Sequence, residues 1–284
     1  MKLDKFYNSF KEISKIVKFE DIEYLNTNTN QNNESNDIIK QIDIVSNNII
    51  IKHILYYEEI IGYISEEEKE LKMIKEPKKD KENYVISFDP LDGSKNIASN
   101  ITVGSIYCVF KYDYRTNSLT EIVEAGYCLY GPKTILVKTN NKLVETYTLN
   151  KNNEFIKGKN IRFDSNTDSK LYAINTSNRY SNEINQYITY LNCRNYNQRW
   201  IGAMVADCHQ ILVKGGIFLY PESKKYPNGK LRTLYEGIPF SYIFHCAGGI
   251  GVNCNYTPIS INILNVDLNN IDLQKPKSII LPSM

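Results

Sequence analysis

The chain has 284 residues, enough for one large α/β domain or two medium ones with a substantial core. Lysine and arginine total 34 against 32 aspartates and glutamates, so the net charge of +2 excludes the global basic field of a nucleic-acid-binding protein. No apolar run approaches the roughly 18 residues of a membrane span, and the charged N-terminus lacks the apolar core of a secretory signal.

The N-terminal part of the chain alternates helical periodicity with polar stretches. Apolar residues recur at helical spacing over residues 3–18 and again over 37–56. The asparagine-rich stretch "NTNTNQNNESND" between them has little to bury and predicts a mobile loop. Ser65 then precedes the acidic run "EEEKE", whose composition by itself favours a solvated face.

Strands are expected next along the chain. "YVISF" at 84–88 is short, β-branched and aromatic, which predicts a buried strand that ends at Asp89. "ITVGSIYCVFKY" and "EIVEAGYCLYGPKTILVKT" are further strand-rich segments, with turns such as "DYRTNS" between them. The first half therefore predicts two helices followed by several strands.

A second unit is expected from about residue 165. Helices are predicted over 181–192 and 205–215, and a short strand over 216–221. The segment 231–249 predicts one long helix closed by glycines, which can adopt the left-handed cap conformation. "KSIILPSM" predicts a final strand.

The cysteines and histidines give no sign of a zinc site. The six cysteines form no CxxC pair and mostly lie in apolar runs, which is typical of buried, reduced thiols in a cytosolic protein. The three histidines lack ligand spacing such as HExxH. We therefore expect a cytoplasmic protein.

The segment "FDPLDGSKN" at 88–96 carries the clearest chemistry. A strand that ends at Asp89 delivers its carboxylate to the edge where α/β folds bind ligands, and Asp92 presents a second carboxylate nearby. Gly93 and Ser94 offer backbone N–H groups to an anion. Carboxylates beside phosphate-binding amides require a cation between them, so the segment predicts Mg²⁺ or Mn²⁺.

The same residue types are also typical of a tight turn. By itself the segment is therefore compatible with either a metal site or a turn. More carboxylates are needed to complete a metal site. Glu66 and Glu67 in the acidic run and Glu236 in "LYEGIP" are candidates.

Several ordered motifs between about residues 40 and 250 resemble those of the fructose-1,6-bisphosphatase family. They are "KQIDIVSNN", "YISEEEKE", "FDPLDGSKN", "AGYCLYGPKTILV" and the long block from "RWIGAMVADCHQ" to "HCAGG". The first of these motifs alone marks the wider lithium-sensitive phosphatase superfamily. The last block singles out the fructose bisphosphatase branch.

The resemblance implies a metal-dependent site. It implies Glu66, Asp89, Asp92 and Glu236 as metal-binding carboxylates, with Leu91 contributing its backbone carbonyl. Asp43 and Glu67 match residues that position and activate the attacking water, and with Asp89 and Asp92 they form the expected catalytic set. Glu68 and Glu70 keep their interpretation as solvated residues.

The resemblance also implies a sugar-bisphosphate pocket. Lys230 matches the lysine that contacts the sugar and a phosphate, and Arg232 is a weaker candidate. In the family the arginine matched by Arg199 reaches across a dimer interface, so a homodimer or homotetramer is expected. The expected substrate-binding residues are Gly93, Ser94, Lys95, Asn175, Arg199, Trp200, Tyr220, Lys230 and Arg232.

The sequence departs from the family pattern in three places. Trp200 and Asn178 stand where the distal phosphate pocket has tyrosines. Residues 1–18 match only the second leading helix, and Asn83 and Lys111 replace two AMP-binding residues, so AMP inhibition is expected to be weak or absent. Lys95 replaces a serine, either to meet the leaving phosphate or as a solvent-facing lysine.

The resemblance therefore implies a layered α-β-α-β-α sandwich with subdomains at 1–160 and 161–284. The expected reaction is Mg²⁺-dependent hydrolysis of the 1-phosphate of fructose 1,6-bisphosphate in gluconeogenesis. A sedoheptulose-1,7-bisphosphatase or dual-specificity enzyme is the first alternative. A catalytically silent family member is the second, although the retained set of six carboxylates argues against it.

Overall fold

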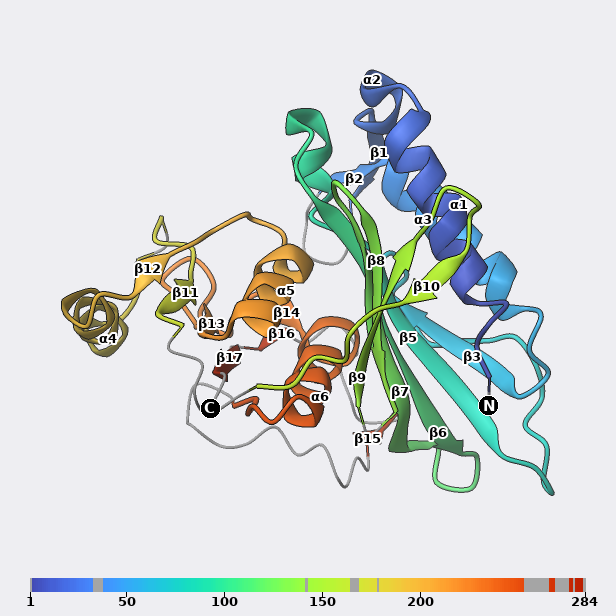
Figure 1. The fold of residues 1–284 in the computed structure, drawn as a ribbon. Coiled ribbons are helices and arrows are strands. Elements are labelled where there is room, and N and C mark those ends of the chain that lie inside the picture. The colour runs from blue at the N-terminus through green and yellow to red at the C-terminus, as the bar shows by residue number, and fades with distance from the viewer. Residues whose placement is uncertain are drawn as a thin grey trace.

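The computed structural model of the protein describes residues 2–32, 38–140, 143–163, 169–177, 179–252, 266–268, 276–277 and 279–282. Its elements stack in alternating layers, as Figure 1 shows: helices from the N-terminal part of the chain, the large sheet, a second layer of helices, a small sheet, and an outer helix. This arrangement confirms the α-β-α-β-α sandwich. Within the described residues, none of the helices is both long and apolar enough to cross a membrane.

Helices cover both faces of the large sheet, and a further helix packs on the outer side of the small sheet. Their bounds are α1 Tyr7–Phe19, α2 Ile22–Leu25, α3 Gln41–Ile54, α4 Asn182–Cys193, α5 Met204–Lys214 and α6 Ile238–Cys246. A 3₁₀ helix spans Ser94–Ser99, and a single π-helical turn spans Thr233–Gly237.

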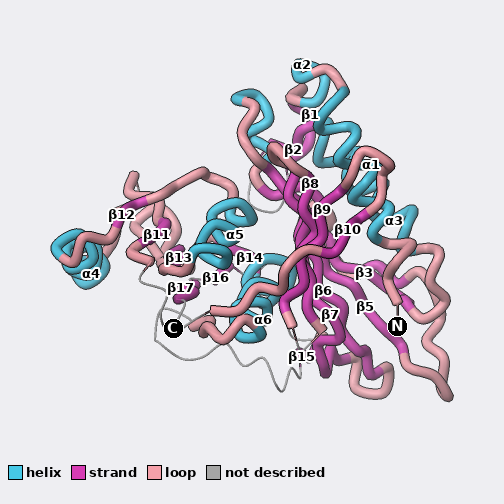
Figure 2. The backbone as a smooth tube through the Cα atoms, in the orientation of Figure 1, coloured by secondary structure: helices cyan, strands magenta, loops and turns pink. Residues whose placement is uncertain are grey.

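The large sheet, magenta in the centre of Figure 2, is antiparallel apart from the adjacent pair β3 and β5. Its strands in spatial order are β10 Phe155–Lys157, β9 Val144–Leu149, β8 Thr134–Thr139, β7 Ser118–Tyr130, β6 Val103–Asp113, β5 Asn83–Asp92, β3 Ile60–Ser65 and β4 Lys72–Met73; β15 Val266–Asp267 pairs with β7. Because β3 and β5 run parallel, their carboxyl ends meet at one edge.

The small sheet has the order β12 Asn197–Gln198, β11 Leu171–Ala173, β13 Ile217–Tyr220 and β17 Ile279–Pro282. Two further strand pairs are β1 Asn28–Asn32 with β2 Ile38–Lys40, and β14 Leu231–Arg232 with β16 Pro276–Lys277. The small sheet packs against α5 and α6 on one side and shares a small core with α4 on the other.

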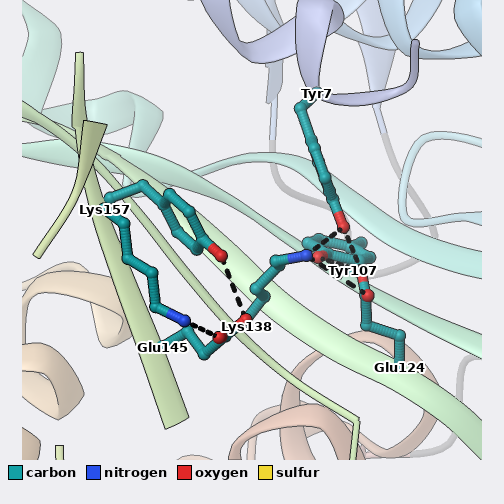
Figure 3. Close-up of polar contacts among 7 residues, drawn as sticks. Tyr7, Tyr107, Glu124, Lys138, Glu145 and Lys157 are labelled. Carbon is teal, nitrogen blue, oxygen red and sulfur yellow. Dashed lines mark hydrogen bonds and ion pairs between the residues drawn. The ribbon is translucent and has the colours of Figure 1, made fainter. Parts of the chain in front are cut away.

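Helix α1 packs on the large sheet through apolar and polar contacts. Phe10 and Ile13 are fully buried. Beside them, Figure 3 shows the phenols of Tyr7 and Tyr107 converging on Glu124, to which they donate hydrogen bonds of 2.6 and 2.7 Å. Lys138 donates to the Tyr7 hydroxyl at 3.2 Å. We call Tyr7, Tyr107, Glu124 and Lys138 the α1–sheet cluster.

Most of the predicted elements are present, with some different bounds. The strand expected to end at Asp89 continues to Asp92, with an irregular register that lets both carboxylates face the same region. Part of the asparagine-rich stretch forms β1, so the prediction of a loop throughout was wrong there. Cys193 is exposed, against the expectation of a buried thiol.

The predicted long helix over 231–249 was also wrong. This segment begins as β14, continues through the π-helical turn, and becomes regular only in α6. Pro239, in the first turn of α6, explains the late start because proline lacks an N–H donor and favours the first helical turn. The boundary between 1–160 and 161–284 stays a prediction.

Candidate active site

A cavity of about 210 Å³ lies where the edge of the large sheet meets α3, α5 and the small sheet. All of the site residues predicted from the sequence line it, apart from Arg199. They are Asp43, Glu66, Glu67, Asp89, Leu91, Asp92, Gly93, Ser94, Lys95, Asn175, Trp200, Tyr220, Lys230, Arg232 and Glu236.

An acidic cluster forms the floor of the cavity. Asp89, Asp92 and Glu236 each place a carboxylate oxygen within 4.8 Å of the others. Asp89 and Asp92 come from the irregular end of β5, and Glu236 comes from the π-helical turn. Hard oxygen ligands at this separation suit Mg²⁺ or Mn²⁺, so the donor set fits a divalent cation.

Hydrogen bonds fix the orientation of this cluster. The Asp89 side chain accepts the backbone N–H of Leu91 at 2.9 Å, and Asp92 accepts that of Val205 at 2.7 Å. The backbone N–H of Arg232 donates to Glu236. Each carboxylate is therefore held by the backbone, so the cluster is oriented before any cation binds.

Burial makes the negative charges of the cluster costly without a cation. It raises the pKa of Asp92 to about 7 and that of Glu236 to about 8, with further increases from the neighbouring carboxylates. The fully enclosed Asp89 has its pKa raised well above its usual value for the same reasons. A divalent cation would offset both the burial and the mutual repulsion.

Asp43, Glu66 and Glu67 line the same cavity as the acidic cluster. Asp43 lies in the first turn of α3, where its carboxylate accepts the backbone N–H of Lys40 at 2.8 Å. Burial raises the pKa of Asp43 to about 7, against the lowering effect of that hydrogen bond. A carboxyl group with this pKa can accept or release a proton near neutral pH.

Gly93 connects the cluster to the 3₁₀ helix in a conformation that only glycine adopts easily. Its φ is +81°, and a Cβ atom there would lie 2.3 Å from the Cβ of Ala203. The close approach of these two segments brings Ser94 and Lys95 to the cavity wall.

Further lining residues come from the second half of the chain. Asn175 follows β11, and Trp200 and Tyr220 lie against each other with ring centroids 6.0 Å apart. Lys230 precedes β14, where the Arg232 guanidinium donates to the Lys230 carbonyl. Arg232 is only 5% exposed, so its positive charge is buried beside the cavity. Cations and hydrogen-bond donors thus line the same cavity as the acidic cluster.

Arg199 is the predicted site residue that this cavity does not include. It is exposed, and its guanidinium donates to the Gln198 carbonyl at 3.1 Å. Asn178, expected in the distal phosphate pocket, lies outside the described residues.

Asp207 is a site-supporting residue that the sequence interpretation missed. It is fully buried in the first turn of α5, where it accepts the backbone N–H groups of Ile201 and Gly202 at 2.8 and 3.0 Å. These bonds fix the segment that carries Trp200. A carboxylate on the apolar face of the helix "VADCHQ" was the available signal.

Comparison with known protein families gives matches over almost the whole chain. The N-terminal domain of fructose-1-6-bisphosphatase matches residues 1–160, and the C-terminal domain matches residues 165–276. The class 1 fructose-1,6-bisphosphatase of Neisseria meningitidis serogroup B is 38% identical over 246 residues, which cover 80% of this chain and 74% of that protein. That of Cytophaga hutchinsonii is 33% identical over 253 residues, or 82% and 72%.

Solved structures of fructose-1,6-bisphosphatase also match this chain. The crystal structure of Leishmania major fructose-1,6-bisphosphatase in holo form superposes with a TM-score of 0.87 at 31% identity. The match covers 98% of this chain and 89% of that one. The apo form of the same enzyme gives a TM-score of 0.79.

Proposed function

Because this chain belongs to the fructose-1,6-bisphosphatase family and is a phosphatase, we propose that it hydrolyses the 1-phosphate of fructose 1,6-bisphosphate. The products are fructose 6-phosphate and inorganic phosphate, as in gluconeogenesis, and the proposed location is the cytoplasm. The observation that carries this proposal is that an acidic cluster and the cationic Lys230 and Arg232 line one cavity.

The proposed metal ligands are Glu66, Asp89, Asp92, Glu236 and the backbone carbonyl of Leu91. Bound Mg²⁺ or Mn²⁺ would neutralise the charge of the transferred phosphate and make the phosphorus more electrophilic. The chain's own contribution is to hold these oxygens in place through the N–H groups of Leu91, Val205 and Arg232. The bonds from Val205 and Arg232 favour the ionised carboxylates and so offset part of their mutual repulsion.

Asp43 and Glu67 are the proposed acceptors of the proton from the attacking water. Asp43 is suited to this task because burial raises its pKa to about 7, so its carboxyl group exchanges a proton near neutral pH. Water attacks the phosphorus opposite the ester oxygen and gives one proton to the carboxylate. The bond from phosphorus to the ester oxygen breaks, the departing sugar oxygen takes a proton from solvent, and the carboxyl group then returns its proton to solvent. Both residues line the cavity wall beside the acidic cluster.

The sugar bisphosphate is proposed to lie in this cavity. Gly93, Ser94 and Lys95 would contact the reacting phosphate, and Lys230 and Arg232 would contact the sugar and its phosphates. Asn175, Trp200 and Tyr220 would receive the distal phosphate. Arg199 would serve the site of a neighbouring subunit, which requires a homodimer or a larger assembly.

Weak or absent AMP inhibition is part of the proposal. Lys111 forms ion pairs of 3.0 Å with both Glu82 and Glu121. The Asn83 amide bonds the backbone of Lys78, and the Tyr84 hydroxyl donates to Glu82. Asn83 and Lys111, which replace two AMP-binding residues, and the adjacent Tyr84 are therefore already bonded to neighbouring protein groups.

Steady-state phosphate release from fructose 1,6-bisphosphate, with and without EDTA and AMP, tests the proposal. We expect release that requires Mg²⁺, is lost in Asp92→Asn, and changes little with AMP. A larger kcat/KM for sedoheptulose 1,7-bisphosphate than for fructose 1,6-bisphosphate would identify the seven-carbon sugar as the preferred substrate. No phosphate release with Mg²⁺ would favour the catalytically silent family member.

A further inference from the structure

The turn that carries Glu66 and Glu67 is anchored through its first residue, Ser65. The backbone N–H of Glu67 donates to the Ser65 hydroxyl at 3.2 Å, and the N–H of Glu68 donates to the Ser65 carbonyl at 3.3 Å. The N–H of Glu66 donates to the Phe88 carbonyl on β5 at 3.2 Å. Ser65 is completely buried, so its hydroxyl requires a protein partner.

That partner is Asn47 on α3. The Ser65 hydroxyl donates to the Asn47 side-chain oxygen at 2.7 Å, and Asn47 is 7% exposed. Asn47 follows Asp43 by four residues, so the two side chains project from the same face of α3. One helix thus presents Asp43 to the cavity and, one turn later, holds the turn of Glu66 and Glu67.

The nitrogen of the Asn47 side-chain amide contacts Glu68. It donates to Glu68 Oε1 at 3.3 Å, and the Tyr63 hydroxyl donates to the same oxygen at 3.0 Å. Burial, followed by the hydrogen bond to Glu68 and its negative charge, raises the pKa of Tyr63, so the phenol remains a donor. Glu68 is therefore half-buried and held, rather than solvated as expected, whereas Glu70 is exposed.

We propose that Asn47 and Glu68 form a positioning pair that sets the carboxylates of Glu66 and Glu67 relative to Asp43. The pair does not touch substrate. It acts through Ser65, whose hydroxyl receives the Glu67 N–H, and through the turn that ends at Glu68. This inference rests on the proposed function, because it assigns the pair to the metal-binding and water-activating side of that site.

A charge-swap experiment tests the pair. Glu68→Gln alone has a small effect, because an amide oxygen still accepts from Tyr63 and Asn47. Asn47→Asp alone brings two carboxylates together, and we expect kcat to fall about 10-fold and half-saturating Mg²⁺ to rise about as much. KM for fructose 1,6-bisphosphate stays within about 2-fold of wild type, because the residues proposed to bind the sugar are unchanged. The double variant regains a donor facing a carboxylate and recovers to within about 3-fold of wild type.

Two controls separate this inference from general effects. Glu70→Gln removes an exposed carboxylate of the same acidic run and leaves kcat and Mg²⁺ dependence unchanged. The Mg²⁺-induced rise in Tm, measured without substrate, shrinks in Asn47→Asp and returns in the double variant. This second readout remains valid even if wild type fails to hydrolyse fructose 1,6-bisphosphate, which would refute the proposed function alone.

The inference is overturned if Asn47→Asp leaves kcat and the Mg²⁺ response of Tm unchanged. It is equally overturned if Glu68→Gln gives no recovery in the Asn47→Asp background. Should Asn47→Asp be unfolded at the assay temperature, recovery of both folding and the Mg²⁺ response in the double variant supports the pair, and recovery of folding alone assigns it a purely structural role.

Discussion

The backbone N–H of Val205 donates to the Asp92 carboxylate at 2.7 Å, across 113 positions of the sequence. Asp92 ends β5 of the large sheet, and Val205 lies in the first turn of α5, which packs on both sheets. One carboxylate of the acidic cluster is therefore held by the helix between the two sheets. The helix N-terminus also favours the ionised form of that carboxylate.

The stability of the metal-free protein should fall as pH rises. Burial raises the pKa of Asp43 and Asp92 to about 7 and of Glu236 to about 8, whereas the unfolded carboxyl groups titrate near pH 4. The folded state thus holds protons that the unfolded chain has released. The associated stability is complete below about pH 4 and is lost as pH rises to about 8.

Thermal unfolding in EDTA at pH 5.5 and pH 8 measures this loss, and Mg²⁺ should restore most of it at pH 8. In Asp92→Asn the difference between the two pH values should shrink by on the order of 1 kcal/mol, since Asp92 is half-buried. A wild-type protein that is more stable at pH 8 than at pH 5.5 in EDTA would contradict the expectation.

Arg199 should act in the site of a neighbouring subunit, because it is exposed and outside its own cavity. Arg199→Ala should raise KM about 10-fold or more, the effect of removing one charge-assisted bond to phosphate. Mixing Arg199→Ala with Asp92→Asn subunits tests the arrangement, since each hybrid dimer would contain one complete site. Activity above the sum of the two variants supports sharing; no gain after subunit exchange argues against it.

Lys95 should contact the reacting phosphate. It replaces a small hydroxyl residue of the family pattern and lines the cavity beside Ser94. Lys95→Ser should raise KM about 3- to 10-fold, a modest effect because the lysine is exposed. Lys69→Ser, an exposed lysine of the acidic run, is the control. Unchanged KM and kcat in Lys95→Ser would assign Lys95 to the solvent.

The α1–sheet cluster should contribute to stability rather than to catalysis. Tyr7→Phe removes the 2.6 Å hydrogen bond to Glu124 seen in Figure 3 and should cost about 1–2 kcal/mol. Tyr24→Phe, at a side chain that is 51% exposed, should cost less than about 0.5 kcal/mol. Urea unfolding of both variants gives the comparison, and equal costs would show that the Glu124 bond is not stabilising.

The predictions from sequence succeeded where the signal was local. Apolar residues recur at helical spacing before Phe19 and after Gln41, and a β-branched run precedes Asp89. Each pattern specifies a buried face and thereby indicates whether the segment forms a helix or a strand. The long helix predicted over 231–249 was wrong because apolar content alone does not reveal where Pro239 permits a helix to begin.

The order of motifs along the chain by itself determined the family and the identity of the candidate carboxylates, since each motif is a contiguous run of residues. Only the tertiary structure decided how they combine. Asp43, Asp92 and Glu236 come from a helix, a strand end and a π-helical turn, and their raised pKa values arise from burial that no local pattern specifies. Glu68 belongs to an acidic run whose composition indicated a solvated face. In the folded protein Tyr63 and Asn47 donate hydrogen bonds to it, so it helps to hold the turn of Glu66 and Glu67.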